Sequence, residues 1–205
     1  MHWKEKVYIL EKNDDFDVAI FFMQQIVENN PDDVDAYIFL LFRLMYSIIE
    51  HSCHFANVSQ TPVSDIKKQY YDEKEGYYED LLLTYFAKGY EKFSENAEFL
   101  FYTAEIACIS NAMSDIYMGL DGESINKMMD KAALLDPENP VFKLRYYSAI
   151  SKKNPNDPEL LLYKQSIFDE TSLLRQEFKK KGLLGEYLLG LMKYWSQHMT
   201  SGTYT

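Results

Sequence analysis

Three side chains that can bind a metal ion lie within four residues of one another, at His51, Cys53 and His54. On a helix, His51 and His54 share a face and Cys53 points elsewhere. A structural zinc site needs four nitrogen or sulfur ligands, and the rest of the chain offers one further cysteine and two further histidines. The cluster therefore favours the end of a helix over a metal site, and we expect no metal and no cofactor.

A second segment combines aromatic with acidic side chains, in the sequence KKQYYDEKEGYYEDLLLTYF. Its tyrosines recur at intervals of seven residues, which is two turns of a helix. They could pack on neighbouring helices with their hydroxyls at the rim. They could also form a binding surface, because tyrosine is common at interaction hot spots and acidic neighbours suit a basic partner. The binding hypothesis predicts a surface made of these residues: Tyr70, Tyr71, Asp72, Glu73, Glu75, Tyr77, Tyr78, Glu79 and Asp80.

The charge of the chain is concentrated in its first half. Its 205 residues carry 32 acids and 21 Lys or Arg, a net charge of −11. Residues 1–100 hold 19 of the acids and nine of the cations. Such a charge repels nucleic acid and anionic membranes and attracts basic proteins. An equally simple explanation is that the acids keep a helical protein in solution.

Motifs of common enzyme classes are missing. The sequence has no Gly-x4-Gly-Lys-Ser/Thr phosphate loop, no Gly-x-Ser-x-Gly and no His-Glu-x-x-His. Carboxylates such as Asp32, Asp33 and Asp35 stand beside an expected helix start, where they act as caps and dipole partners. We therefore expect a protein that is not an enzyme, with a regulatory enzyme domain separated from its partner domain as the alternative.

Apolar periodicity, caps and breakers predict about nine helices. We expect them over 3–10, 16–28, 34–54, 64–93, 96–118, 123–135, 140–151, 158–181 and 183–199. Residues 56–62 are the clearest internal loop, and the only charge within AYIFLLFRLMYSII is Arg43, which needs a carboxylate partner if it is buried. No apolar run is long enough to span a membrane, and the first residues lack a signal-peptide layout. With two cysteines far apart, these features predict a cytoplasmic protein.

Two helix ends share a spacing of four, three and five residues up to a proline. They are Ile125-Met129-Ala132-Pro137 and Ala19-Met23-Ile26-Pro31, and a weaker copy without proline is Leu82-Phe86-Gly89-Ser94. This spacing, running into a new helix, resembles the second helix and turn of a tetratricopeptide repeat (TPR). The intervals between turns depart from the TPR period of about 34 residues, so the copies are degenerate and their helices elongated.

The resemblance implies an all-α fold, a TPR-like right-handed α-solenoid of antiparallel helix pairs closed by a C-terminal capping helix. One domain would cover residues 1–199, with a disordered tail at 200–205. TPR proteins that bind a terminal carboxylate use Lys and Asn on their first helices. Ile38 and Phe42 stand at the matching positions here, so the resemblance implies a general protein-binding module.

Two functions of this class fit the sequence. The chain is similar to some small acidic helical immunity proteins, which implies an antitoxin-type inhibitor that masks a basic toxin. The alternative is a cytoplasmic chaperone or adaptor that binds an apolar peptide of a client in a TPR-like groove. The first predicts binding at the acidic tyrosine-rich surface and the second predicts binding in an apolar groove.

Overall fold

The computed structural model of the chain describes residues 2–13, 15–58, 65–109, 118–143, 154 and 156–198. Side chains are described over the same ranges except within 51–58 and 65–71 and at 195, 197 and 198. Contacts divide the chain into two compact units, Met1–Ala132 and Ala133–Thr205. The single repeat domain expected over residues 1–199 stays a prediction.

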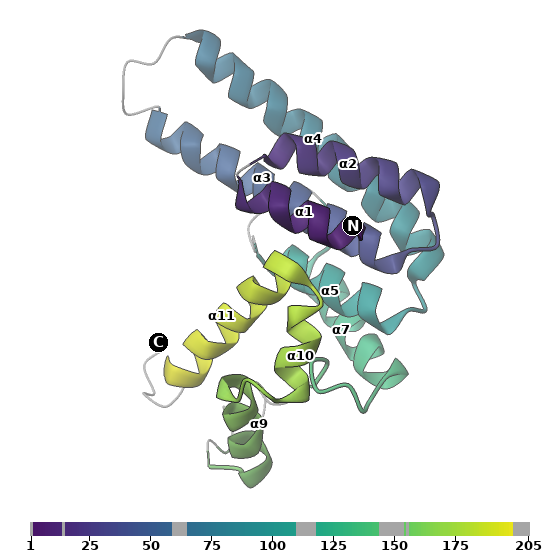
Figure 1. Cartoon of the computed structure of the whole chain (residues 1–205), viewed down its shortest axis with the longest axis vertical. Coiled ribbons are helices and arrows are strands. Elements are labelled where there is room, and N and C mark those ends of the chain that lie inside the picture. The colour runs from purple at the N-terminus through teal and green to yellow at the C-terminus, as the bar shows by residue number, and fades with distance from the viewer. Residues whose placement is uncertain are drawn as a thin grey trace. The chain divides into compact units, whose positions relative to one another are not determined.

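The described residues form an all-α structure of nine helices without strands (Figure 1). Within the described ranges, each expected helix except the one over 140–151 has at least one counterpart. In the first unit the helices are α1 (Trp3–Lys12), α2 (Phe16–Asn29), α3 (Val34–Val58), α4 (Asp65–Phe93) and α5 (Ala97–Cys108), and α7 (Gly122–Leu135) ends just beyond it. The second unit holds α9 (Pro158–Phe168), α10 (Leu173–Lys179) and α11 (Gly182–His198).

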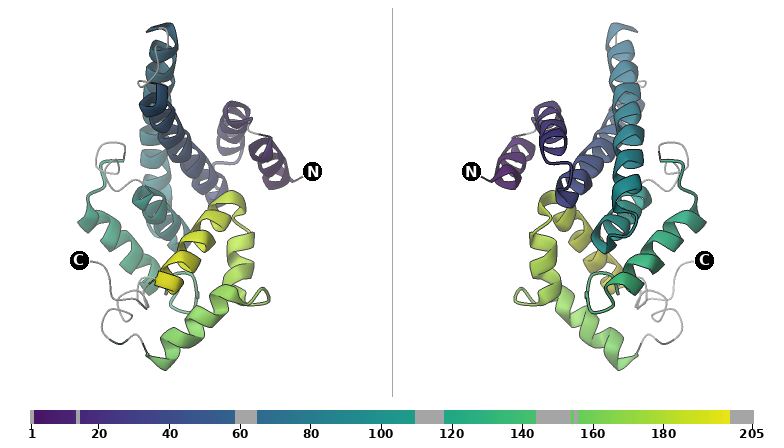
Figure 2. Two further views of the ribbon diagram at one scale, coloured as in Figure 1. Left: turned by 90° about the vertical axis from the view of Figure 1, so that its left-hand side faces the viewer. Right: turned by 90° about the vertical axis from the view of Figure 1, so that its right-hand side faces the viewer.

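The core of the first unit is built around α3. From Ala36 to Met45 every side chain of this helix is buried, as its nearly continuous apolar sequence predicts. The helix packs against α2, α4 and α5, and Figure 2 shows α3 and α4 side by side from two further directions. These contacts pack α4 into the first unit.

Arg43 is the buried charge of α3, with 1% of its surface exposed. Its guanidinium donates to Ser47 Oγ at 3.2 Å and to Glu50 Oε2 at 2.7 Å. It also lies 3.7 Å from the centre of the Phe16 ring, a favourable cation–π contact. The prediction that Arg43 needs a carboxylate partner is thus confirmed. Burial lowers the pKa of this arginine from its usual value, and the nearby Glu50 carboxylate opposes the shift.

Short polar side chains begin most of the helices. Asp33 Oδ1 accepts the backbone N–H of Ala36 at 3.1 Å, and its other oxygen accepts Trp3 Nε1 at 3.0 Å, which ties α1 to the start of α3. Asn96 Oδ1 caps α5 by accepting the N–H of Phe99 at 2.9 Å. These bonds satisfy N–H groups that the first turn of a helix leaves without a partner.

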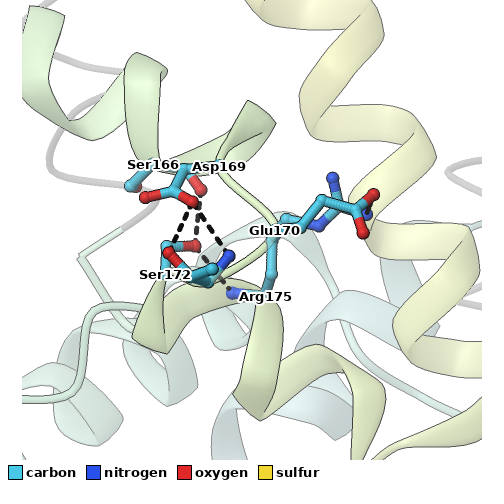
Figure 3. A network of polar contacts seen from close by, with 6 residues as sticks. Ser166, Asp169, Glu170, Ser172 and Arg175 are labelled. Carbon is cyan, nitrogen blue, oxygen red and sulfur yellow. Dashed lines mark hydrogen bonds and ion pairs between the residues drawn. The ribbon is translucent and has the colours of Figure 1, made fainter.

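In the second unit the helix expected over residues 158–181 is wrong, because it is two helices, α9 and α10. Asp169 accepts both the N–H and the hydroxyl of Thr171, and Ser172 caps α10 at the N–H of Arg175. Figure 3 shows this junction, where Ser172 Oγ also donates to the carbonyl of Ser166 at 2.6 Å. Such local bonds compete with helix continuation.

Three further boundaries differ from expectation. Ala56 to Val58 belong to α3 and not to a loop, while residues 59–62 lie outside the described part. The helix expected over 96–118 ends at Cys108, followed by a turn at Ile109; residues 110–117 are not described. Residues 140–143 form a turn instead of the start of a helix, and the rest of that expected helix, like the tail at 200–205, is not described. None of the described helices is long and apolar enough to cross a membrane.

Candidate protein-binding surface

The tyrosines of α4 lie on different sides of the helix. Tyr78 and Tyr85 are buried, with 2% and 4% of their surface exposed, and both hydroxyls donate to carboxylates of α2. The Tyr78 hydroxyl donates to Asp17 Oδ1, and the Tyr85 hydroxyl donates to Glu28 Oε1 at 3.4 Å. These two tyrosines therefore serve the packing of α4, so Tyr78, which we expected at the binding surface, contributes no exposed ring to it.

Tyr77 lies on the outer side of α4, with 52% of its surface exposed. Its ring packs at a tilt against Tyr78, with the ring centres 5.7 Å apart. Because Tyr78 is fixed by burial and by its bond to Asp17, it supports one side of the Tyr77 ring. An aromatic side chain held in this way loses little conformational entropy when a partner binds.

The acidic segment, residues 72–80, holds five carboxylates and one lysine. Asp72, Glu73 and Asp80 are exposed, while Glu75 and Glu79 are half-buried. The lysine, Lys74, forms an ion pair with Asp17 of α2 at 2.7 Å. The positive charge of the segment is thus directed to α2. Two of the exposed carboxylates, Glu73 and Asp80, stand four residues before and three residues after Tyr77, on the same side of the helix.

Tyr70 and Tyr71 belong to α4, but their side chains lie outside the described residues, as do those of His51, Cys53 and His54. Within the part of the chain that is described, no group of three His, Cys, Asp or Glu side chains is placed to hold a metal ion. Cys108 is described and takes part in no disulfide.

Two exposed residues of α4 extend the outer surface beyond the acidic segment. Leu83 and Tyr90 are each 42% exposed, and we did not predict them because the run of carboxylates ends at Asp80. Their separation of seven residues, the same interval that marked the tyrosines, would have identified them. The outer side of α4 is therefore apolar as well as acidic along its later turns.

Several described groups have clearly shifted pKa values, and structural contacts explain them. Burial raises the pKa of Tyr85 from its usual value. Hydrogen bonds from the Ser124 side chain and backbone lower the pKa of Asp121, which caps α7, and bonds from the Thr171 backbone and hydroxyl lower that of Asp169. These shifts belong to packing and helix starts, as does that of Arg43.

Comparisons of the chain with protein-family models, curated proteins and solved structures found no match. We therefore infer the function from the residues and their geometry alone.

Proposed function

We propose that the chain is a non-enzymatic protein-binding module whose acidic segment takes a basic protein partner. The observation that carries the proposal is the exposed Tyr77 ring with exposed Glu73 and Asp80 on its side of the helix and exposed Asp72 in the same segment. Tyrosine offers a large, stiff contact surface, and the carboxylates attract a cationic partner over a distance. The ion pair between Lys74 and Asp17 strengthens this arrangement because it directs the opposing charge to α2.

Within this class, we propose an antitoxin-type inhibitor that neutralises a basic toxin in the cytoplasm. An acidic surface that covers a basic active surface would inhibit it directly, and charge complementarity would speed its association. The proposed framework is a stack of antiparallel helix pairs similar to TPR repeats. The close approach of Gly89 to Phe99 and Tyr37, at the position that Ala132 takes in the Ile125-Met129-Ala132-Pro137 copy, supports that framework.

A second candidate is an adaptor that binds an apolar peptide of a client protein. The favouring observation is the exposure of large apolar side chains in the second unit, where Leu162 is 66% and Leu173 is 70% exposed. Exposed apolar groups of this size are common at peptide-binding surfaces. The two candidates predict different binding residues, so one set of variants separates them.

The experiment uses the product of the neighbouring gene and a toxicity assay. We expect co-expression of this chain to restore growth of cells that express that product, and the purified pair to associate more slowly as salt rises. The Debye length falls from ~30 Å at 0.01 M to ~8 Å at 0.15 M ionic strength, which screens the attraction. A triple variant, Asp72→Lys, Glu73→Lys and Asp80→Lys, should abolish both the rescue and the salt dependence.

The matched control makes the same change of charge in the second unit, at three exposed carboxylates. It consists of Glu138→Lys, Glu159→Lys and Glu186→Lys. If both triple variants weaken binding equally, only the total charge matters and the acidic segment is not the site. If neither changes binding but Leu162→Lys does, the adaptor is the better hypothesis.

A further inference from the structure

The outer side of α4 carries a regular spacing that extends past the acidic segment. Gly76, Asp80, Leu83, Ala87 and Tyr90 follow one another at intervals of four, three, four and three residues. We call these five residues the outer stripe. The stripe covers ~21 Å at 1.5 Å per residue, and four-three spacing is the pattern by which one helix packs along another.

The structure leaves the outer stripe open. Asp80, Leu83, Ala87 and Tyr90 are exposed, and a Cβ atom added at Gly76 would meet no atom within 4 Å. The same spacing recurs on the opposite side of α4 at Tyr78, Leu82, Tyr85 and Gly89, and all four of these residues are buried. One side of α4 is thus covered by its own unit, and the other repeats the packing pattern where no described part of the chain covers it.

The side chains of the stripe define the shape of that occupant. Leu83 and Tyr90 offer apolar contact area, while Gly76 and Ala87 are small enough to let a second backbone come close. Asp80 stands in the middle of the stripe. A carboxylate at such a position selects a partner with a cation opposite it, because burying the charge without a partner is costly.

Charge distinguishes a basic partner from a second copy of this chain. Residues 72–91 include six acids and two lysines. Lys74 pairs with Asp17 of α2, and Lys88 lies 5.2 Å from the ring centre of the inward-facing Tyr85. Two such surfaces placed together would bring like charges into contact, which is unfavourable.

We propose that the outer stripe binds a basic amphipathic helix of the partner, with apolar residues at four-three spacing and a Lys or Arg opposite Asp80. The proposal rests on the proposed function, because it names the partner's structure at the same surface, and it extends the site to Leu83, Ala87 and Tyr90. Recognition of one helix by another along such a stripe draws its affinity from a few apolar anchors and its selectivity from charge.

The test uses two fluorescein-labelled synthetic peptides of 21 residues. One has Leu at the four-three positions with Lys beside them, and the other has the same composition in scrambled order. Fluorescence anisotropy at 0.15 M salt should show the patterned peptide binding the full chain about tenfold more tightly than the scrambled one. Leu83→Lys should weaken the patterned peptide about tenfold, a change equal to ~1.4 kcal/mol.

The matched control is Leu162→Lys, which adds the same charge at an exposed leucine of α9 and should change the affinity less than twofold. A second variant, Ala87→Gln, adds bulk without charge on the stripe and should also weaken binding. Circular dichroism checks that each variant remains helical. Equal weakening by Leu83→Lys and Leu162→Lys would overturn the assignment of the stripe.

The outcomes separate this inference from the proposed function. In one outcome the two peptides bind with equal affinity, and the triple variant at Asp72, Glu73 and Asp80 abolishes the binding of both. That result would overturn the inference that the partner is a helix and would leave the proposal of a basic partner in place. No binding of either peptide, even at low salt, would count against both. A dimer of the chain that Leu83→Lys dissociates would show that a second copy occupies the stripe instead.

Discussion

Gly89 of α4 lies where two aromatic side chains leave no room for a larger residue. A Cβ atom at this position would lie 2.7 Å from Phe99 Cε2 and 3.1 Å from Tyr37 Cδ1. The Phe99 ring is fully buried and packs on Phe93, with the ring centres 5.6 Å apart. It cannot move away without disturbing its neighbours, so Gly89→Ala should force α4 away from α5 or the ring out of its rotamer.

The magnitude follows from two opposing terms. Alanine is favoured over glycine inside a helix by ~1 kcal/mol, and overpacking a core costs ~1–3 kcal/mol. Gly89→Ala should therefore lower the free energy of unfolding by ~0–2 kcal/mol. Gly76 is the matched control on the same helix, since an added Cβ there meets nothing within 4 Å. Gly76→Ala should raise the free energy of unfolding by up to ~1 kcal/mol.

The assay is urea unfolding followed by the fluorescence of Trp3, which reports on the first unit because its ring packs edge-on against Phe39. Trp195→Phe removes the only other tryptophan. The helix term is common to both alanine variants, so their difference of ~1–3 kcal/mol isolates the packing of Gly89. With a slope of ~2 kcal/mol per M, their midpoints should differ by ~0.5–1.5 M. Equal midpoints would refute the close approach of α4 to Phe99.

Three further predictions test other contacts. Arg43→Ala should lower the free energy of unfolding by ~3 kcal/mol in the same assay. The substitution removes a buried, paired guanidinium together with its ring contacts, and it leaves a cavity. A decrease below ~1 kcal/mol would contradict this prediction. Burial raises the pKa of Tyr85 above its usual value of 10.0, so this tyrosine ionises at a lower pH in the unfolded chain than in the folded one. The contribution of its neutral hydroxyl to the free energy of unfolding is therefore present below pH ~10 and is lost as pH rises further. Tyr85→Phe should thus reduce the fall in the free energy of unfolding between pH 7 and a pH above 10, measured by urea titration at both. A fall of the same size in the variant and in the unchanged chain would disprove this prediction. Gly185→Ala would place a Cβ atom 1.8 Å from the backbone oxygen of Phe178, whereas a Cβ atom at Gly190 would have no atom within 4 Å. Thermal unfolding followed by circular dichroism should show a large decrease in the melting temperature for Gly185→Ala and none for Gly190→Ala.

The start of a helix was easier to predict than its interruption. The bounds expected for α2 differ from the structure by one residue, because Asp15, a residue type that favours helix starts, precedes the helix and the Asn-Asn-Pro sequence ends it. Asp15 holds the N-cap position without a hydrogen bond from its side chain. The break between α9 and α10 has no glycine or proline. Asp169 and Ser172 interrupt the helix by hydrogen bonds to nearby backbone groups, and these residue types also occur within helices. Sequence pattern alone does not distinguish the two cases.

The sides of α4 show a second limit of sequence patterns. The interval of seven residues places Tyr71, Tyr78 and Tyr85 on one side of the helix and Tyr77 on an adjacent side. Both sides contain tyrosine and both are flanked by carboxylates, so the pattern does not show which one is buried. Periodicity gives the angle between two residues and not the direction in which the core lies. The core direction is set by α3, and by Asp17 and Glu28 on α2, which are distant in sequence.

The polar contacts between α2 and α4 connect the fold to the proposed function. Asp17 accepts a hydrogen bond from the Tyr78 hydroxyl and forms an ion pair with Lys74, and the Tyr85 hydroxyl donates to Glu28. Apolar packing already resists rotation of α4 about its axis, and these directional bonds further fix its orientation. A fixed α4 keeps Tyr77 and the outer stripe on the opposite side. The carboxylates of α2 that hold the inward tyrosines therefore also determine which tyrosine is offered to a partner.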